Sequence, residues 1–321
     1  MKAKSKKYRG LIISAILLVV FTILIYLISS AFLSVNIKEV KILGGDGLTY
    51  AVDVYVPKSA TNATPAPLVM WVLGGGSEGD FCATWGTELA RRGYVTVITD
   101  GVGRGSSQMK ASLTADIDFS TDETRAYRMT EFARNVYDAV IDFPFVDRDN
   151  VTLIGHSMGS NISVGLTQYV TQVKGGKIAN LITLLGMGFS SSTRTLIGDT
   201  NLYALLSLKD HYWRGYTDES AQVKVEETMA TFDPSITDPA MGVMYGNPLE
   251  GGSTYVGWTN KRTLHGSAPF IPSLKSEVVE YLQSLGTTPN PISSKNILSI
   301  WRDVFGAFAI AALVWFIIEL T

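Results

Sequence analysis

The sequence predicts an α/β fold in which helices cover both faces of a mostly parallel sheet. Strand-like and helix-like segments alternate from Ile37 to Leu285, several strand-like runs are apolar throughout, and a glycine-bordered turn joins one of these runs to a helix. Both chain ends lie outside this pattern. The predicted organisation is a basic tail and membrane helix over 1–33, an α/β domain over 34–300 and a second membrane helix over 301–321.

The N-terminal segment combines a basic start with an uncharged apolar run from Leu11 to Leu33. This run is long enough to cross the hydrocarbon core as a helix, and the positive-inside bias keeps its basic end in the cytoplasm. The domain after Leu33 is therefore expected on the extracytoplasmic side. The alternative is a cleaved signal peptide, because Ser29, Ser30 and Ala31 form an acceptable cleavage site. The length of the run favours a retained anchor.

The C-terminal segment is apolar from Val304 until Glu319, near the final Thr321. It approaches the lower length limit for a bilayer helix and predicts a second membrane span. The alternatives are an interfacial helix, a buried core helix or a sequence cut short. If both segments span, the middle of the chain is one domain tethered at each end.

The elements of the domain follow in order. A hairpin is expected where 37–43 and 48–57 flank GGDG, and the run 68–73 is of the kind buried on both faces of a sheet. A helical stretch then ends at Arg92. Further strands are expected at 94–100, 150–155, 177–188 and 201–210, and further helices at 122–142, after Ser157, and at 273–285.

Charge and cysteine content exclude several classes of protein. The chain has 27 basic and 29 acidic residues, and beyond the N-terminus the basic ones are scattered, so a nucleic-acid partner is not expected. The single cysteine, Cys82, excludes an internal disulfide and a cysteine-rich zinc site. We expect this cysteine to pack in a helix.

The segment GHSMG, from Gly155 to Gly159, fits the G-x-S-x-G pattern at a predicted strand-to-helix junction. A nucleophile in this strained turn requires small flanking residues, so that strand and helix can pack closely. The helix behind Ser157 directs backbone N–H groups and its positive dipole end toward a developing oxyanion. Ser157 is therefore the candidate nucleophile.

A serine hydroxyl needs a histidine base, and that base needs a carboxylate to fix its tautomer. The chain has three histidines: His156 adjoins the serine and is expected to point elsewhere, His211 follows Asp210 directly, and His265 precedes the last domain helix. We take His265 as the base and Asp210, at the end of a predicted strand, as its carboxylate. Asp210 could instead be a solvated loop carboxylate, and its competitors are Asp218, Asp233 and Asp238.

An oxyanion hole requires two donors. One is the N–H of Met158, after the nucleophile, and the other is expected in GGGSEGD after the strand at 68–73, where Gly75 and Ser77 are the best-placed residues. A phosphate-cradling loop is the rival interpretation, but this segment lacks the Lys-Ser/Thr ending.

With these motifs the chain resembles the α/β-hydrolase superfamily from about Ile37 to Leu285. The resemblance implies a central, mostly parallel sheet of about eight strands with helices on both faces. It also implies that Asp100 and Arg104, in the loop after the strand at 94–100, are structural.

Two features depart from the family pattern: its frequent His-Gly pair after the third strand is replaced by Leu73-Gly74 or Gly75-Gly76, and the interval from Asp210 to His265 is long. That interval is expected to hold an extra excursion whose aromatic residues either line a pocket or only pack: Tyr212, Trp213, Tyr216, Tyr245, Tyr255 and Trp258.

The prediction for function is a membrane-tethered serine hydrolase of the carboxylesterase or lipase kind, which cleaves an ester or related acyl bond through an acyl-enzyme intermediate. Its partners would be the membrane and a small-molecule or lipid-like acyl substrate, and no metal or organic cofactor is implied. A serine peptidase, a thioesterase or an acyltransferase could use the same residues. A noncatalytic membrane binding protein that retains the hydrolase shell is the alternative from another class.

Overall fold

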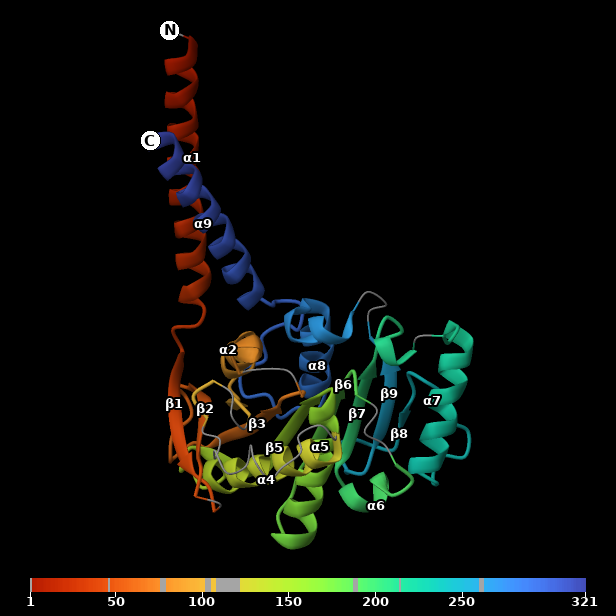
Figure 1. Ribbon diagram of the computed structural model, residues 1–321. Helices are drawn as coiled ribbons and strands as arrows, with labels where there is room; N and C mark the ends of the chain where they lie inside the picture. Colours follow the sequence, from red (N-terminus) through yellow and green to blue (C-terminus); the bar gives the residue numbers. More distant parts are fainter. Residues whose placement is uncertain are drawn as a thin grey trace.

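The computed structural model describes residues 2–45, 47–75, 79–101, 105–107, 122–186, 190–213, 215–259 and 263–321. These residues form one α/β domain from which two long helices project side by side (Figure 1). Their elements are named below in chain order.

The central sheet of the described chain has nine strands in the order β1-β2-β4-β3-β5-β6-β7-β9-β8. Its middle is parallel from β4 to β9, whereas the outer pairs β1/β2, β2/β4 and β8/β9 are antiparallel. The strands are β1 (Val35–Leu43), β2 (Thr49–Pro57), β3 (Ala66–Val72), β4 (Val95–Thr99), β5 (Val146–His156), β6 (Asn180–Leu184), β7 (Asn201–Leu206), β8 (Met244–Tyr245) and β9 (Thr254–Trp258).

Helices cover both faces of the sheet because side chains of the central strands alternate between two apolar layers. In β3, Leu68 and Met70 belong to one core cluster, and Val69 and Trp71 belong to the other. The first cluster packs against α4 (Asp122–Val140), α5 (Met158–Gln168), α6 (Thr193–Ile197) and α7 (Asp218–Phe232); a π-helical turn, η2 (Tyr169–Val173), continues α5. The second cluster packs against α2 (Ala83–Ala90) and α8 (Pro272–Ser284). Each apolar strand run is thus buried on both sides, as the sequence predicts.

The predicted hairpin, strands and long helices are all present, with ends shifted by a few residues. The main difference concerns the interval between Asp210 and His265, which was expected to hold an extra excursion. It contains α7, but it also contains β8 and β9, and β9 pairs with β7 in parallel. The sheet therefore has nine strands in the described residues, where about eight were expected.

Three short 3₁₀ segments complete the fold: η1 (Gly79–Cys82), η3 (His211–Trp213) and η4 (His265–Phe270). Cys82 ends η1 at the start of α2 and is a free, buried thiol, so it packs as expected. Asp100, after β4, accepts hydrogen bonds from the backbone N–H groups of Gly79 (3.3 Å) and Ser106 (3.0 Å), a bracing role consistent with the structural one implied for it. Arg104 lies outside the described residues.

The terminal helices are α1 (Lys2–Ser30) and α9 (Ser299–Leu320). Within them, Tyr8–Ser30 and Ser299–Leu320 are long and apolar enough to cross a membrane, and only 6% of either stretch is buried. This exposure excludes a core-helix role for α9 in the described chain. The two helices contact each other along their length, with the ring of Phe21 stacked on Phe305 and Phe308 at centroid distances of 6.1 and 5.3 Å.

A buried ion cluster joins α9 to the domain. Glu88, in α2, is 1% exposed, and one of its oxygens accepts hydrogen bonds from the backbone N–H groups of Leu298 (2.7 Å) and Ser299 (2.8 Å) at the start of α9. Its other oxygen pairs with Arg91 and Arg92, each at 2.6 Å. We call Glu88, Arg91 and Arg92 the joint. Because the carboxylate caps N–H groups at the start of α9, this end of the helix is anchored to the domain.

Candidate active site

Ser157 occupies a sharp turn between β5 and α5, in the backbone conformation φ 56°, ψ −124°. A non-glycine residue rarely adopts a positive φ, and the cost is tolerated here because the surrounding packing determines the turn. A Cβ atom on Gly155 would collide with the carbonyl of Gly159, and one on Gly159 would collide with the carbonyl of Val72. Both flanking glycines are therefore required for the close packing of β5, α5 and β3.

Of the three side chains predicted from the sequence, His265 lies within hydrogen-bonding distance of both Ser157 and Asp210. The Nε2 atom of His265 is 2.7 Å from the Oγ of Ser157, and its Nδ1 atom is 2.7 Å from the Oδ2 of Asp210. Ser157 follows β5, Asp210 lies in the turn after β7 and His265 begins η4. The carboxyl ends of parallel strands meet at one edge of a sheet, which explains how residues 108 positions apart reach each other.

Asp210 is 4% exposed, so it is not a solvated loop carboxylate. Its Oδ1 accepts a hydrogen bond from the backbone N–H of Tyr212 at 3.2 Å. The competitor Asp233 is bound instead to Arg194, Ser235 and Thr254. Burial with fixed donors holds the Asp210 carboxylate in one orientation toward His265.

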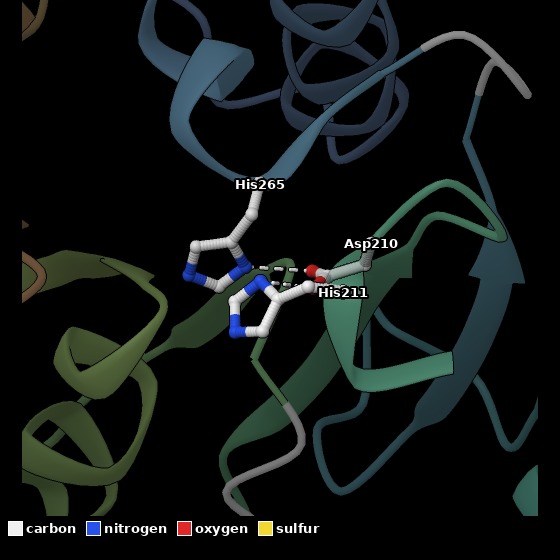
Figure 2. A group of neighbouring side chains, drawn as sticks. All are labelled: Asp210, His211 and His265. Carbon is white, nitrogen blue, oxygen red and sulfur yellow. Dashed lines mark hydrogen bonds and ion pairs between the residues drawn. The ribbon is translucent and has the colours of Figure 1, made fainter. Parts of the chain in front are cut away.

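A second imidazole lies against the same carboxylate. The Nδ1 atom of His211 is 3.2 Å from the Oδ1 of Asp210, and Figure 2 shows the two histidine side chains beside this carboxylate. Ligand atoms from Asp210, His211 and His265 all lie within 4.8 Å of one another, a set that could hold a metal ion. Such an ion would compete with the proton that the Nδ1 atom of His265 shares with Asp210.

His156 does not point away from the site, contrary to the expectation from sequence. It is 4% exposed, and its Nε2 lies 2.9 Å from the backbone carbonyl oxygen of His265. Burial, together with the nearby charge of His265, lowers the pKa of His156 to about 4. The ring is thus neutral at pH 7 and can donate its Nε2–H to that carbonyl. No local pattern in the chain indicates this bond, because nothing near His156 in the sequence shows which loop covers it.

Of the three residues expected to supply oxyanion donors, the structure describes Met158 and Gly75. Met158 is the first residue of α5, so its N–H lies at the positive end of the helix dipole, directly after Ser157. Gly75 lies on the wall of the same pocket as Ser157, whereas Ser77 is outside the described residues. The preceding Gly74 is close to the serine, since a Cβ built on it would be 3.1 Å from the Cβ of Ser157.

A pocket of about 300 Å³ opens over Ser157 and His265. Its outer wall is made by Phe81 from η1 and by Pro269 and Phe270 from η4. Apolar walls around a small polar centre are typical of sites that bind an organic substrate.

Most of the aromatic residues expected in the long interval pack against other side chains. Trp213 meets Tyr216 and Trp258 edge to face, and Tyr255 stacks on Tyr203. Tyr245 accepts and donates hydrogen bonds within its own loop. Tyr212 is the exception, because its ring stacks on His211 and lies 5.4 Å from that of His265.

Comparison with solved structures identifies the fold. A putative dienelactone hydrolase from Klebsiella pneumoniae has a TM-score of 0.54 at 13% identity, over 78% of this chain and 98% of that one. A dienelactone hydrolase-like promiscuous phosphotriesterase from metagenomic libraries has a TM-score of 0.51 at 15% identity, over 86% and 98%. An esterase from Pyrococcus furiosus has a TM-score of 0.51 at 14% identity, over 78% and 93%.

Sequence comparison adds no closer relative: no family model matches the chain, and no curated protein matches it significantly. The likeness therefore lies in the arrangement of the sheet and its helices. The chain has the α/β-hydrolase fold, with a long apolar helix at each end.

Proposed function

We propose that the protein is a serine hydrolase that cleaves a carboxylic ester. The observation that carries this proposal is the unbroken chain of short contacts from Ser157 through His265 to Asp210, each 2.7 Å long. A buried carboxylate that accepts the Nδ1–H of an imidazole leaves Nε2 free to take a proton from the serine hydroxyl. The esterases and hydrolases among the structures of similar fold support the same reaction class.

In the proposed reaction Ser157 Oγ attacks the ester carbonyl while its proton passes to Nε2 of His265. The N–H of Met158 and N–H groups of the loop at 75–77 stabilise the oxyanion. The tetrahedral intermediate collapses, the C–O bond to the leaving group breaks, and the alcohol departs with the proton from His265. Water, deprotonated by His265, then attacks the acyl-enzyme, and the carboxylic acid is released as Ser157 regains its proton.

The test combines covalent labelling with a matched substitution. A fluorophosphonate probe is expected to label the full chain on Ser157, and Ser157→Ala should abolish both labelling and hydrolysis of p-nitrophenyl acetate. Asp210→Asn should lower kcat by about 10⁴-fold, because the imidazole loses its anchored tautomer. Asp233→Asn, which removes a carboxylate bound to Arg194, should leave kcat near wild type. Absence of labelling in folded protein would support the noncatalytic binding protein instead, and cleavage of amides alone would support a peptidase.

We further propose that α1 and α9 hold the domain at a membrane, with the domain on the extracytoplasmic side. Their length and apolarity support this, and the basic residues before the first apolar run favour a cytoplasmic N-terminus. With two spans, the C-terminus returns to the cytoplasm. A membrane-impermeant amine reagent applied to intact cells should therefore label exposed lysines of the domain. Labelling that appears only after the cells are lysed would contradict this orientation.

A further inference from the structure

Two exposed aromatic rings border the opening of the pocket over Ser157. Phe81 and Phe270 are 47% and 40% exposed, and their rings meet edge to face with centroids 6.0 Å apart. Leu264, directly before η4, is 57% exposed. We call Phe81 and Phe270 the mouth. Large apolar side chains that gather at the entrance of a pocket mark a surface that contacts apolar material.

Helix α2 connects the mouth to the joint. Phe81 lies in η1, which continues directly into α2, and the indole Nε1–H of Trp85 donates a hydrogen bond of 3.0 Å to the carbonyl oxygen of Pro269, beside Phe270. Glu88 follows Phe81 by seven residues, a separation on the order of 10 Å along a helix. The entrance to the site is therefore held close to the point where α9 leaves the domain.

The foot of α1 meets the same place. Phe32, just after α1, is 9% exposed, and the guanidinium groups of Arg91 and Arg302 lie over its ring at 5.7 and 5.9 Å. Next to these contacts, Leu33 and Trp301 are 68% and 51% exposed. Exposed tryptophan at the end of an apolar helix is typical of the membrane–water boundary. Both terminal helices thus start from one corner of the domain.

Figure 1 shows where α2, which follows η1, lies relative to the long helices. Helices α1 and α9 extend within the plane of the picture, whereas α2 is seen close to its own axis. In this view both ends of α2 therefore lie at a similar level below the feet of the long helices. The carboxyl ends of β7 and β9, with η4 beyond them, lie on the side of the domain from which α1 and α9 project (Figure 1).

We propose that the mouth lies against the surface of the bilayer that holds α1 and α9, and that the acyl chain of an ester lipid enters the pocket from that bilayer. The substrate class is thus a long-chain ester presented by the membrane. This proposal rests on the proposed function. An acyl chain that passed through water to a distant pocket would expose its methylene groups, whereas a pocket mouth in contact with the bilayer avoids that exposure.

The position of the mouth can be tested without any measurement of hydrolysis. In a Cys82→Ala background, single cysteines replace Phe81, Phe270 or, as the matched control, Leu249, which is 70% exposed near the opposite, amino-terminal ends of the central strands. The full chain is spin-labelled in phosphatidylcholine vesicles. The spin labels at 81 and 270 should be more accessible to oxygen than to a water-soluble nickel chelate. The label at 249 should be more accessible to the nickel chelate than to oxygen. Labels at 81 and 270 as accessible to nickel as the label at 249 would overturn the proposal.

The substrate class is tested by a ratio of two rates in the same vesicles. One substrate is a fluorogenic long-chain ester dissolved in the bilayer, and the other is p-nitrophenyl acetate in the water. Phe81→Asp with Phe270→Asp should lower the ratio of the first rate to the second by at least about tenfold. Leu249→Asp should leave the ratio within about twofold of wild type. An unchanged ratio in the double variant would count against entry of lipid at the mouth.

Failure of the two proposals gives different results. If Ser157→Ala abolishes hydrolysis of p-nitrophenyl acetate but the labels at 81 and 270 are water-exposed, the enzyme proposal stands and the membrane-facing mouth fails. If neither ester is cleaved by the wild-type chain, the proposed function fails, and the label accessibilities still decide where the mouth lies.

Discussion

The ring of His156 and the backbone of His265 form a direct link, because the Nε2 of His156 lies 2.9 Å from the carbonyl oxygen of His265. This contact joins the turn that carries the serine to the loop that carries the base. It restrains the backbone of His265, while the carboxylate of Asp210 restrains its ring. We therefore expect His156 to act as a positioning residue for the proposed base.

Removal of this link should slow the reaction more than it weakens substrate binding. We expect His156→Leu to lower kcat by about 10- to 100-fold, since one restraining hydrogen bond is lost, with a much smaller change in KM. His156→Gln, which retains an N–H donor, should recover part of the loss. Steady-state kinetics on a water-soluble ester measure both constants. Equal losses in the Leu and Gln variants would show that the hydrogen bond is not what matters.

Zinc ions should inhibit hydrolysis through the group drawn in Figure 2. Nitrogen and carboxylate ligands from His211, His265 and Asp210 lie within 4.8 Å of one another, and Zn²⁺ prefers ligands of these kinds. A bound zinc ion would coordinate His265, the proposed base, and so slow hydrolysis. A chelator that removes the ion should restore the rate. Because His211 is a ligand but not part of the proposed triad, His211→Gln should raise the inhibitory zinc concentration by at least about tenfold.

The joint should contribute strongly to stability. Burial opposes ionisation of Glu88, but Arg91, the backbone N–H of Ser299 and Arg92 outweigh it and hold the pKa of Glu88 below its ordinary value. Glu88→Gln should lower the free energy of unfolding by about 3–5 kcal/mol, because two buried guanidinium groups lose their counter-charge. Denaturant titration in detergent micelles measures this loss. Exposed Glu227→Gln is the control and should change the free energy by less than about 0.5 kcal/mol.

The carboxylate of Glu88 also determines how the stability of the protein changes at acidic pH. A group whose pKa is lower in the folded chain stabilises it above the unfolded pKa, near 4.3 for glutamate, and this contribution is lost as the pH falls through the folded pKa. Wild-type protein should therefore lose stability at pH values below about 4, and Glu88→Gln should flatten this part of the curve.

Lys275 is a buried charge that costs stability at neutral pH, whereas Glu88 adds to it. Its side chain is fully buried in α8, where it donates one hydrogen bond of 2.7 Å to Thr84, and burial lowers its pKa to about 8 despite the nearby charge of Glu88. Between pH 8 and its ordinary pKa of about 10.4, the unfolded chain binds more protons than the folded one. The contribution of Lys275 to the free energy of unfolding should therefore increase as the pH rises through that window.

The matching substitution is Lys275→Met, which removes the buried charge while it retains most of the volume. We expect it to raise the free energy of unfolding by about 1–3 kcal/mol at pH 7, with a gain that shrinks toward pH 10. Lys58→Met, at an exposed position, should show neither effect. A destabilised Lys275→Met protein would mean that the hydrogen bond to Thr84 outweighs the cost of desolvation.

Sequence patterns predicted most of the fold because the central strands are buried on both faces and read as continuous apolar runs, as in β3. They failed at β9, Thr254–Trp258, a five-residue strand that contains a glycine and follows the glycine pair Gly251 and Gly252. Its aromatic residues suggested part of an extra excursion that either lines a pocket or only packs. Only its pairing with β7 and the burial of Val256 make it a sheet strand, and these long-range contacts leave no local periodicity.

The residues of the candidate site could be named from the sequence more fully than the contacts that support them. The serine turn requires glycines at fixed spacing, so Ser157 could be recognised locally, and the scarcity of histidines led to His265. The link from His156 and the second imidazole on Asp210 depend on how η3 and η4 fold over the edge of the sheet. No short pattern in the chain encodes that placement.

The two edge strands of the sheet are built in a way that discourages pairing between neighbouring copies of the protein. At one end β8 has only two residues, and at the other β1 has Lys38, Glu39 and Lys41 on a largely exposed ribbon. Short strands and charged side chains at a sheet margin discourage the addition of a neighbour's backbone. Many copies could therefore lie close together without their sheets merging into aggregates.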